Sequence, residues 1–506
     1  MLESDGLTPR LRQAAADLAE LAEQENLTAG LNRRTMDPLH AYEEGINQES
    51  LLLWWQYGDP VYFERCLAAA KSMPSLTTVT PRGHRHFKNQ NCGAEDLRID
   101  RELGTDGHAH GLMLHPSFEV AWYNRSPSVL QYLREWGDGW LDHQQPGEYA
   151  TLVDVATEKN LKVYKDRPLY AGYGGQASAH VFLYWLTGEA KYVRPFLDFY
   201  RADQDHFQPR RWLADLDALG ALADIPDTTE CLRADPFVAA RLGDREPLFE
   251  ALRQDIAEMQ RFPHMYTTAE VFTDRVFLYA IGNAARMYTG GTATRNRYVH
   301  THAVSWEGFG TDYAAFVQQA TEESLRVLLY NFTDRELRGR ARFWRLRHGR
   351  YQVRIGDGQA ALHDLARART LSVALPSRQV VVLEVKLQER LDPLLVRADL
   401  ALSPLDLKLT ATEVRIGVHN IGAAASPASQ LTIHDAAGKT VATMPVPGLA
   451  APTDLLPKRH VIVCRLPRPS GPGWTAAVDA RSQIPEIYEE NNRLPLVPLG
   501  KQKEKR

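Results

Sequence analysis

Residues 51–70 read LLLWWQYGDPVYFERCLAAA, an apolar helical stretch, a tight turn at Gly58 and a second apolar helical stretch. Similar helix–turn–helix patterns recur around Asn124, Gly188 and Gly243, so that successive turns lie 66, 64 and 55 residues apart. Gly and Asn commonly end a helix in a left-handed conformation, and the Asp, Ser or Glu that follows is a typical helix start. A repeat of this kind indicates stacked supersecondary units. The sequence therefore predicts paired antiparallel helices over residues 1–295.

Aromatic side chains stand just before these turns, as in Trp54-Trp55-Tyr57, Trp122-Tyr123 and Tyr184-Trp185. Packing between helices is the ordinary role of such residues, and sugar stacking at the mouth of a cleft is the alternative. The hairpin period and the aromatic turns resemble the α/α-toroid of carbohydrate-active enzymes. That resemblance implies a ring of helical hairpins over residues 1–295, with a catalytic cleft made by the loops at one end.

The hydrophobic period changes near Ser324, where LRVLLYNF, TLSVAL and RQVVVLEVKLQ alternate or are rich in β-branched residues. Such segments predict strands, and we interpret residues 298–390 as a small antiparallel β domain. Arg338, Arg340 and Arg342 would share one face of a strand. A solvated outer face is the simpler interpretation, and a basic edge that faces an acidic substrate is the alternative.

Residues 396–500 contain short strand patterns with turn signals about every 8–12 residues, which predicts an immunoglobulin-like β-sandwich. The run Val418-His419-Asn420-Ile421-Gly422, and the closing Val478-Asp479 with residues 484–492, resemble the cell-adhesion-related bacterial domain called CARDB. The resemblance implies an accessory role and a secreted, periplasmic or cell-surface bacterial location. Residues 501–506 form a short basic tail. The predicted fold class is thus multidomain α + β.

The composition fits a soluble globular protein, since 44% of residues are hydrophobic and 24% are charged. A net charge of −4 gives no general attraction to nucleic acid. No apolar run is long enough to span a bilayer, and the N-terminus lacks the features of a signal peptide. The four cysteines have no CxxC spacing, which argues against a thiolate zinc cluster. We expect a polysaccharide or oligosaccharide partner, no nucleic acid and no membrane span; the oligomeric state stays open.

The stretch from Arg82 to His115, RGHRHFKNQNCGAEDLRIDRELGTDGHAHGLMLH, is unusually rich in titratable groups. Burying so many polar side chains as plain core would be costly. Polar loops on a helical scaffold commonly carry binding and catalysis. We therefore expect this stretch to line the working cleft, together with residues 166–180 and 295–312.

These residue types favour β-elimination on a uronate-containing glycan. A lyase must neutralise the uronate carboxylate, remove the C5 proton and protonate the leaving oxygen, for which Asn or Arg and His or Tyr are suited. Toroid lyases use the same residue types, so the resemblance implies these roles. The expected catalytic residues are His108, His110, Tyr170, Tyr173, Asn91 and Asp106. The expected substrate-binding residues are His84, His86, Asn89, Arg167, Trp122, His302, Trp306 and Glu307.

Two other functions stay open. A glycoside hydrolase needs two carboxyl groups roughly 5–10 Å apart across the scissile bond. Its candidates here are Asp96, Asp106, Glu119, Glu270, Asp274 and Glu307. The other alternative is a non-catalytic glycan-binding or cell-surface protein.

Three HxH pairs leave a divalent metal open as well: His84 with His86, His108 with His110, and His300 with His302. Residues i and i+2 of an extended segment point the same way, so each pair could offer two imidazoles to one ion. Histidines that bind substrate or hold structure are the simpler interpretation, and no HExxH motif is present. We therefore expect no required cofactor and assign no metal ligand from sequence.

Overall fold

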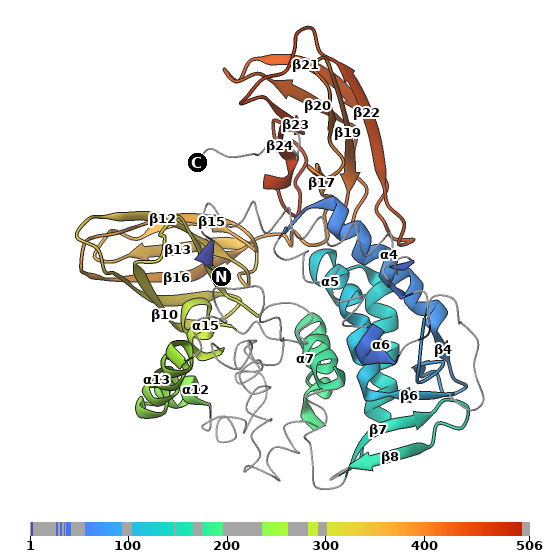
Figure 1. The fold of residues 1–506 in the computed structure, drawn as a ribbon. Helices are drawn as coiled ribbons and strands as arrows, with labels where there is room; N and C mark the ends of the chain where they lie inside the picture. Colours follow the sequence, from blue (N-terminus) through green and yellow to red (C-terminus); the bar gives the residue numbers. More distant parts are fainter. Residues whose placement is uncertain are drawn as a thin grey trace. The chain divides into compact units, whose positions relative to one another are not determined.

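The computed structural model describes residues 2–3, 27–28, 31–32, 35, 37–41, 56–93, 104–145, 148–164, 175–195, 235–261, 282–291 and 301–497 (Figure 1). The chain divides into two compact units. The first unit contains residues 1–10, 140–152 and 160–392, and the second contains residues 11–139, 153–159 and 393–506.

Two β-sheets form the main body of the first unit. Their orders are β1-β9-β12-β15 and β10-β11-β16-β13-β14, and their strands are antiparallel except for β1, which pairs with β9 in parallel. The strands are β1 (Leu2–Glu3), β9 (Val304–Glu307), β10 (Tyr313–Ala320), β11 (Ser324–Asn331), β12 (Leu337–Phe343), β13 (Gly349–Ile355), β14 (Ala361–Leu365), β15 (Thr370–Leu375) and β16 (Val380–Arg390). The strands that we expected between residues 298 and 390 are present.

Alternation of side chains along these strands builds one core. In β11, Leu325, Val327 and Leu329 are buried while the residues between them are half-buried, because successive side chains point to opposite faces of a sheet. They join Trp306 and Tyr351 in a single apolar cluster that draws on both sheets. Burial of these large side chains is the main favourable term for this unit.

The first unit also contains helices α7 (Gln176–Thr187), η4 (Ala190–Tyr192), α12 (Pro236–Arg241), α13 (Glu246–Arg261) and α15 (Gly282–Thr289), and strand β8 (Asn160–Tyr164). Gly188 ends α7 with φ 74°, the left-handed conformation that glycine adopts without strain. Asp235 caps the start of α12 through the backbone amides of Phe237 and Val238, and it also pairs with Arg286 of α15 at 2.5 Å. Local capping therefore also connects helices that are distant in sequence.

The N-terminal part of the second unit mixes helices with short strands. Its helices are α2 (Pro38–Ala41), α4 (Pro60–Leu76), η2 (His108–Leu114), α5 (His115–Asn124) and α6 (Pro127–Asp142). Its strands are β2 (Leu27–Thr28), β3 (Leu31–Asn32), β4 (Thr77–Val79), β5 (Arg85–Phe87), β6 (Thr105–Gly107) and β7 (Tyr149–Asp154). The unit boundaries fall within α6 and β7. Asp59 caps α4, and Arg125 ends α5 with φ 57°.

The C-terminal part of the second unit is a β-sandwich. Its first sheet has the order β17-β19-β18, with β22 paired to β19, and its second has the order β21-β20-β23-β24. The strands are β17 (Leu400–Ala401), β18 (Lys408–Leu409), β19 (Glu413–Asn420), β20 (Ser429–His434), β21 (Thr440–Val446), β22 (Arg459–Arg465), β23 (Thr475–Val478) and β24 (Arg493–Pro495), with η6 (Glu490–Asn492) before the last. Inward side chains of both sheets form one apolar core.

Polar contacts join this sandwich to helices α4 and α5. Tyr123 donates a hydrogen bond to Asp399 at 2.5 Å, and the Asn491 side chain donates to Gly58 O at 3.1 Å. Gly58 is required here, because it has φ 82° and an added Cβ would lie 2.5 Å from the ring of Tyr488. The segment that resembled a closing adhesion signature therefore packs on the helical part of its own chain.

The expected α/α-toroid is wrong. The described residues form no ring of helical hairpins, and they are organised mainly by β-sheets (Figure 1). The turn at Asn124 does join two helices, and so does Gly243, but residues 77–79, 85–87, 105–107, 149–154 and 160–164 form strands between the helices. Helix caps report only where a helix ends, so they could not reveal these strands. Among the described residues, no helix has the length and apolarity to cross a bilayer.

Candidate functional site

The site begins at a tight hairpin that positions two histidines. β4 and β5 pair antiparallel with Thr78 opposite His86, and Gly83 closes the turn between them with φ 87°. His84 stands at the end of this turn and bonds Thr80 through its backbone. α6 passes close by at Gly139, where an added Cβ would lie 2.9 Å from His84 Cβ. Side chains of both His84 and His86 are buried, with ring centroids 6.2 Å apart.

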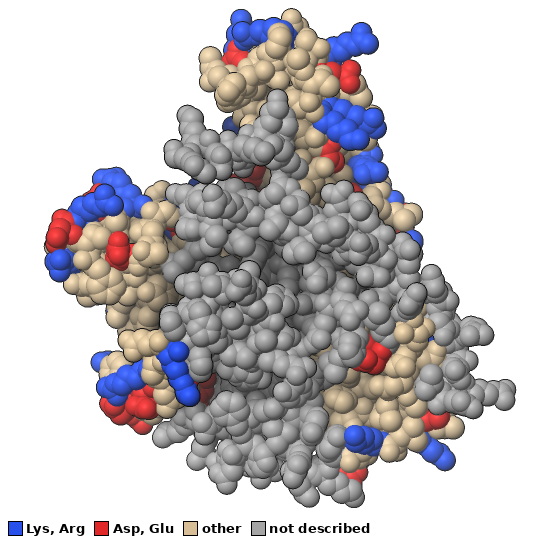
Figure 2. All heavy atoms as spheres, viewed as in Figure 1, with Lys and Arg blue, Asp and Glu red and all other residues tan. Residues whose placement is uncertain are grey.

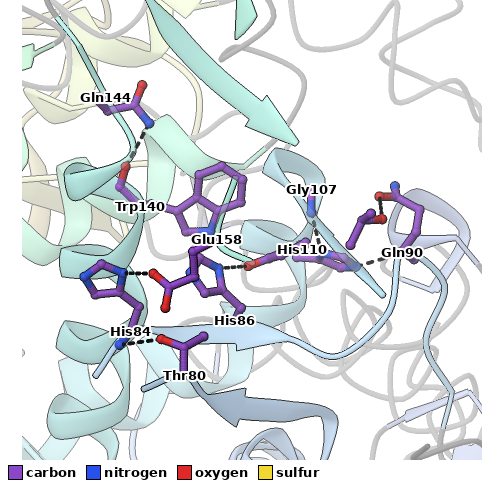
Figure 3. A network of polar contacts seen from close by, with 11 residues as sticks. Thr80, His84, His86, Gln90, Gly107, His110, Trp140, Gln144 and Glu158 are labelled. Atoms are coloured by element: carbon purple, nitrogen blue, oxygen red, sulfur yellow. Dashed lines mark hydrogen bonds and ion pairs between the residues drawn. The ribbon is translucent and has the colours of Figure 1, made fainter. Parts of the chain in front are cut away.

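Asp106, in β6, holds two histidines at once. Its Oδ2 lies 2.9 Å from His86 Nδ1 and its Oδ1 lies 2.6 Å from His110 Nδ1, and all three side chains are fully buried. Figure 3 labels the two histidines. Burial alone would raise the pKa of Asp106, but hydrogen bonds from His110 and His86 and the charge of these rings hold the pKa below its usual value. Asp106 is therefore a carboxylate that orients both rings.

Hydrogen bonds hold both rings in place, and the Gly107 N–H also donates to His110 Nδ1 at 3.0 Å. Because the Asp106 carboxylate only accepts, His86 donates through Nδ1. His110 lies 3.0 Å from Gln90 O through Nε2, and a carbonyl only accepts, so Nε2 carries a proton. Phe87 stacks on the His110 ring at 4.5 Å. His110 is therefore held on both nitrogens and on one face.

Glu158 completes the cluster from the turn between β7 and β8. Its backbone has φ 52°, and its carboxylate accepts from His84 Nδ1 at 2.8 Å and pairs with Arg82 at 3.4 Å. Burial would raise the pKa of Glu158, but hydrogen bonds from Thr80 and His84 and the charges of His84 and Arg82 lower it. A left-handed conformation at a non-glycine residue is sparsely populated and recurs at functional sites.

Together these residues form what we call the His–Glu cluster, which comprises His84, His86 and Glu158. Each side chain brings one ligand atom within 4.8 Å of the others. Imidazole nitrogen and carboxylate oxygen are the donors that zinc-type ions take in proteins. The pairing of Asp106 with His86 is the usual outer-shell arrangement for a ligating histidine. This cluster could therefore hold a metal ion.

Other predicted residues of the stretch 82–115 lie near the cluster residues in sequence. Asn89 is buried, and Asn91 and His108 are half-buried. The Gln90 side chain accepts from Thr105 at 3.4 Å and covers Gly107, where an added Cβ would lie 3.1 Å from it. Sequence reasoning thus gathered several residues that the fold does bring together. It missed Glu158, which is 74 positions from His84 and carries no motif.

Other expected residues occupy different surroundings. Trp122 is 1% exposed and packs edge-on against Tyr57 at 5.6 Å, which places it in the packing core of the second unit. Glu119 is fully buried, and burial raises its pKa well above the ordinary range. Its carboxylate oxygens have no hydrogen-bond partner in the part of the chain that the structure describes.

Three expected residues lie in the first unit instead. His302 and Trp306 are buried, and the Trp306 indole donates to Tyr288 O at 2.8 Å. Glu307 pairs with Arg340 and Arg342, each at 2.6 Å. Arg342 is therefore a partner of Glu307 and not a solvated cation. Arg167, Tyr170, Tyr173, Asp96, Glu270, Asp274 and His300 lie outside the described residues.

Comparisons with known proteins identify no family. No protein-family profile and no curated protein matches the sequence. Solved structures of β-glucuronidase from Ruminococcus gnavus are similar over part of the chain. The complex with uronic isofagomine matches at TM-score 0.13 and 12% identity, over 34% of this chain and 35% of that one. The apo structure matches at TM-score 0.14 and 14% identity, over 44% and 42%. The chain thus spans less than half of these enzymes, and the likeness is too low to carry an argument.

Proposed function

We propose that the His–Glu cluster binds a divalent transition-metal ion and that this centre serves an enzyme acting on a uronate-containing glycan. The observation that carries the proposal is the convergence of three ligand atoms within 4.8 Å in a buried site. Imidazole nitrogens and a carboxylate oxygen are the donor types that zinc sites in proteins use.

The donor set supports a zinc-type ion over calcium or magnesium. Calcium and magnesium take oxygen ligands, and magnesium keeps several waters. His84 and His86 contribute nitrogen, which favours zinc and its neighbours in the first transition series. Asp106 fixes the His86 tautomer with Nδ1 as donor, so Nε2 is the nitrogen that would face the ion.

β-Elimination is the reaction we propose for this centre. When bound, the ion would neutralise the uronate carboxylate. In a site without metal, Asn or Arg would have this role. His108 is half-buried, whereas His84, His86 and His110 are buried. We therefore assign removal of the C5 proton to His108. The C4–C5 double bond then forms as the C4–O bond breaks, and the leaving oxygen takes up a proton from water. Asp106 and His110 position the segment from both sides of Gly107.

Activity on a polyuronate tests this assignment. A lyase produces the ultraviolet absorbance of a C4–C5 double bond, a hydrolase releases reducing ends without that absorbance, and a non-catalytic binder produces neither. His108→Gln should lower turnover by about 10²–10⁴-fold with an unchanged melting temperature. The matched control is His460→Gln, in β22 of the C-terminal sandwich. Turnover of His108→Gln equal to wild type would remove the proton-transfer role.

Metal dependence is tested separately from turnover. Removal of the ion with a chelator should abolish the absorbance change, and zinc should restore it. Full activity after complete removal of the ion would show that the reaction does not use this centre.

A further inference from the structure

The C-terminal sandwich carries four cations on one sheet face. They are Lys408 of β18, Arg415 of β19, and Arg459 and Arg465 of β22. The register places Lys408 opposite Arg415, Arg415 opposite Val463, and Glu413 opposite Arg465. We call the surface formed by these four cations, with Val461 and Val463 of β22, the β22 face. On the same side of β19, His419 is buried against Glu64 of α4 and Asp406 and is not part of this face.

Alternation of side chains shows that this face points away from the core. Val414, Ile416 and Val418 of β19 and Ile462 and Cys464 of β22 are buried in the sandwich core. Side chains between them must point to the other face of the sheet. All four cations are exposed, and Val461 and Val463 of the same face are 42% and 55% exposed. Figure 2 shows Lys and Arg gathered along the side of this domain where Figure 1 places β22.

The four cations lack the acidic partners that other sheet arginines of this chain have. In the first unit, Arg326 and Arg354 both pair with Glu384, and Arg350 pairs with Glu389. On the β22 face, by contrast, no ion pair joins any of the four cations to another described residue. Glu413 stands opposite Arg465 in the register without pairing with it.

Such an arrangement is unfavourable for the isolated domain. Lys408 and Arg415 are directly opposite, and like charges at opposed positions of neighbouring strands destabilise a sheet. The exposed valines add apolar surface between the cations. Among the described strands, β22 pairs with β19 alone, which makes it an edge strand of this sheet. Folding of the sandwich does not require unpaired cations and exposed valines on an edge strand, whereas binding of an extended anion would use each of these features.

We propose that the β22 face binds an extended anionic polysaccharide, with the arginines pairing with carboxylates and the valines contacting the apolar faces of the sugar rings. The choice of a polyuronate rests on the proposed function, but the binding itself does not depend on the His–Glu cluster. Arg459 and Arg465 are six residues apart, so they lie roughly 20 Å apart along the strand. Cations this sparse suit a polymer with separated charges better than duplex DNA, which carries one negative charge per about 1.7 Å.

Calorimetry at low salt, which measures binding of the full chain to polygalacturonate, tests the proposal. The double variant Arg415→Glu with Arg465→Glu should bind at least about tenfold more weakly. Two ion pairs between the arginines and the carboxylates of the polysaccharide are replaced by repulsion. Added salt should weaken wild-type binding, since exposed charges are screened. Arg338→Glu, which reverses a highly exposed cation of the first unit, is the matched control and should bind like wild type.

Several outcomes would overturn the proposal. These are equal affinity of the double variant and wild type, equal binding of neutral dextran, or tighter binding of duplex DNA or anionic lipid vesicles than of polygalacturonate. If the double variant melts at a lower temperature, Arg415→Gln with Arg465→Gln removes the charges without repulsion and must still weaken binding. The His86→Ala variant must retain binding, which separates this face from the metal centre.

Discussion

His419 is the residue at which a change of pH should alter the stability of the second unit most clearly. Its ring is fully buried, with Nδ1 2.6 Å from Glu64 of α4 and Nε2 2.7 Å from Asp406. Both carboxylates only accept, so both ring nitrogens carry protons and the ring is an imidazolium. A single charge therefore connects the C-terminal sandwich to α4 across 355 residues of sequence.

The magnitude follows from the pKa of this ring. Burial alone would lower the pKa of His419, but hydrogen bonds with Asp406 and Glu64 and their charges raise it from 6.5 to about 9. A difference of this size corresponds to about 3 kcal/mol of folding free energy. Because the folded pKa is the higher one, this stabilisation is complete below about pH 6.5 and is lost as the pH rises to about 9.

Urea unfolding across this pH window, for wild type and His419→Gln, isolates the effect. The difference in unfolding free energy between the two proteins should be about 3 kcal/mol larger below pH 6.5 than above about pH 9. Burial also raises the pKa of Asp399 to about 8 and that of Glu486 to about 9, so wild type should lose further stability in the same direction. Both carboxyl groups are present in His419→Gln as well. Their contributions to the unfolding free energy therefore cancel when the two proteins are compared.

His460→Gln is the control, because it makes the same substitution in the neighbouring strand β22. It should shift the unfolding free energy little at any pH. A difference between wild type and His419→Gln that stays constant from about pH 6 to about pH 9 would refute the charged-ring account, because a neutral ring would give no such dependence.

Two further predictions concern the surroundings of the His–Glu cluster. Asp106→Asn should weaken zinc affinity by about 10–100-fold, because asparagine offers one acceptor oxygen where Asp106 offers one each to His86 and His110. Calorimetry measures this, and an unchanged affinity would contradict it. Gly139→Ala should destabilise the protein by about 1–3 kcal/mol, since the new Cβ would lie 2.9 Å from His84 Cβ. Thermal unfolding checks this against Gly471→Ala, whose added Cβ would meet nothing nearer than 3.9 Å.

The sequence predicted the local features of this chain better than its architecture. The turns at Asn124 and Gly243 join helices as expected, because caps depend on a few adjacent residues. The same signals do not specify what a helix packs against, so the resemblance to a toroid was wrong. Residues 149–154 read YATLVD, a β-rich run that we overlooked. The strands after residue 298 were easier, because their alternation is long and regular.

The candidate site was predictable where its residues are close in sequence. The HxH spacing of His84 and His86 indicated two rings on one side of an extended segment. His86 lies in β5 and His84 directly precedes that strand, and both rings reach the cluster. Asp106 and His110 came from the same polar stretch. Glu158 could not be found in this way, because only the folded chain brings the turn after β7 to His84. Its contribution is a long-range contact that no local pattern encodes.

Zinc titration of the chelator-treated protein is the most direct test of the metal centre. We expect about one ion per chain for wild type, and no binding at that site for the double variant His84→Ala with His86→Ala. His108→Ala, from the same stretch but outside the cluster, should bind as wild type does. Equal zinc binding by wild type and the double variant, or none by either, would contradict the assignment of the His–Glu cluster as a metal centre.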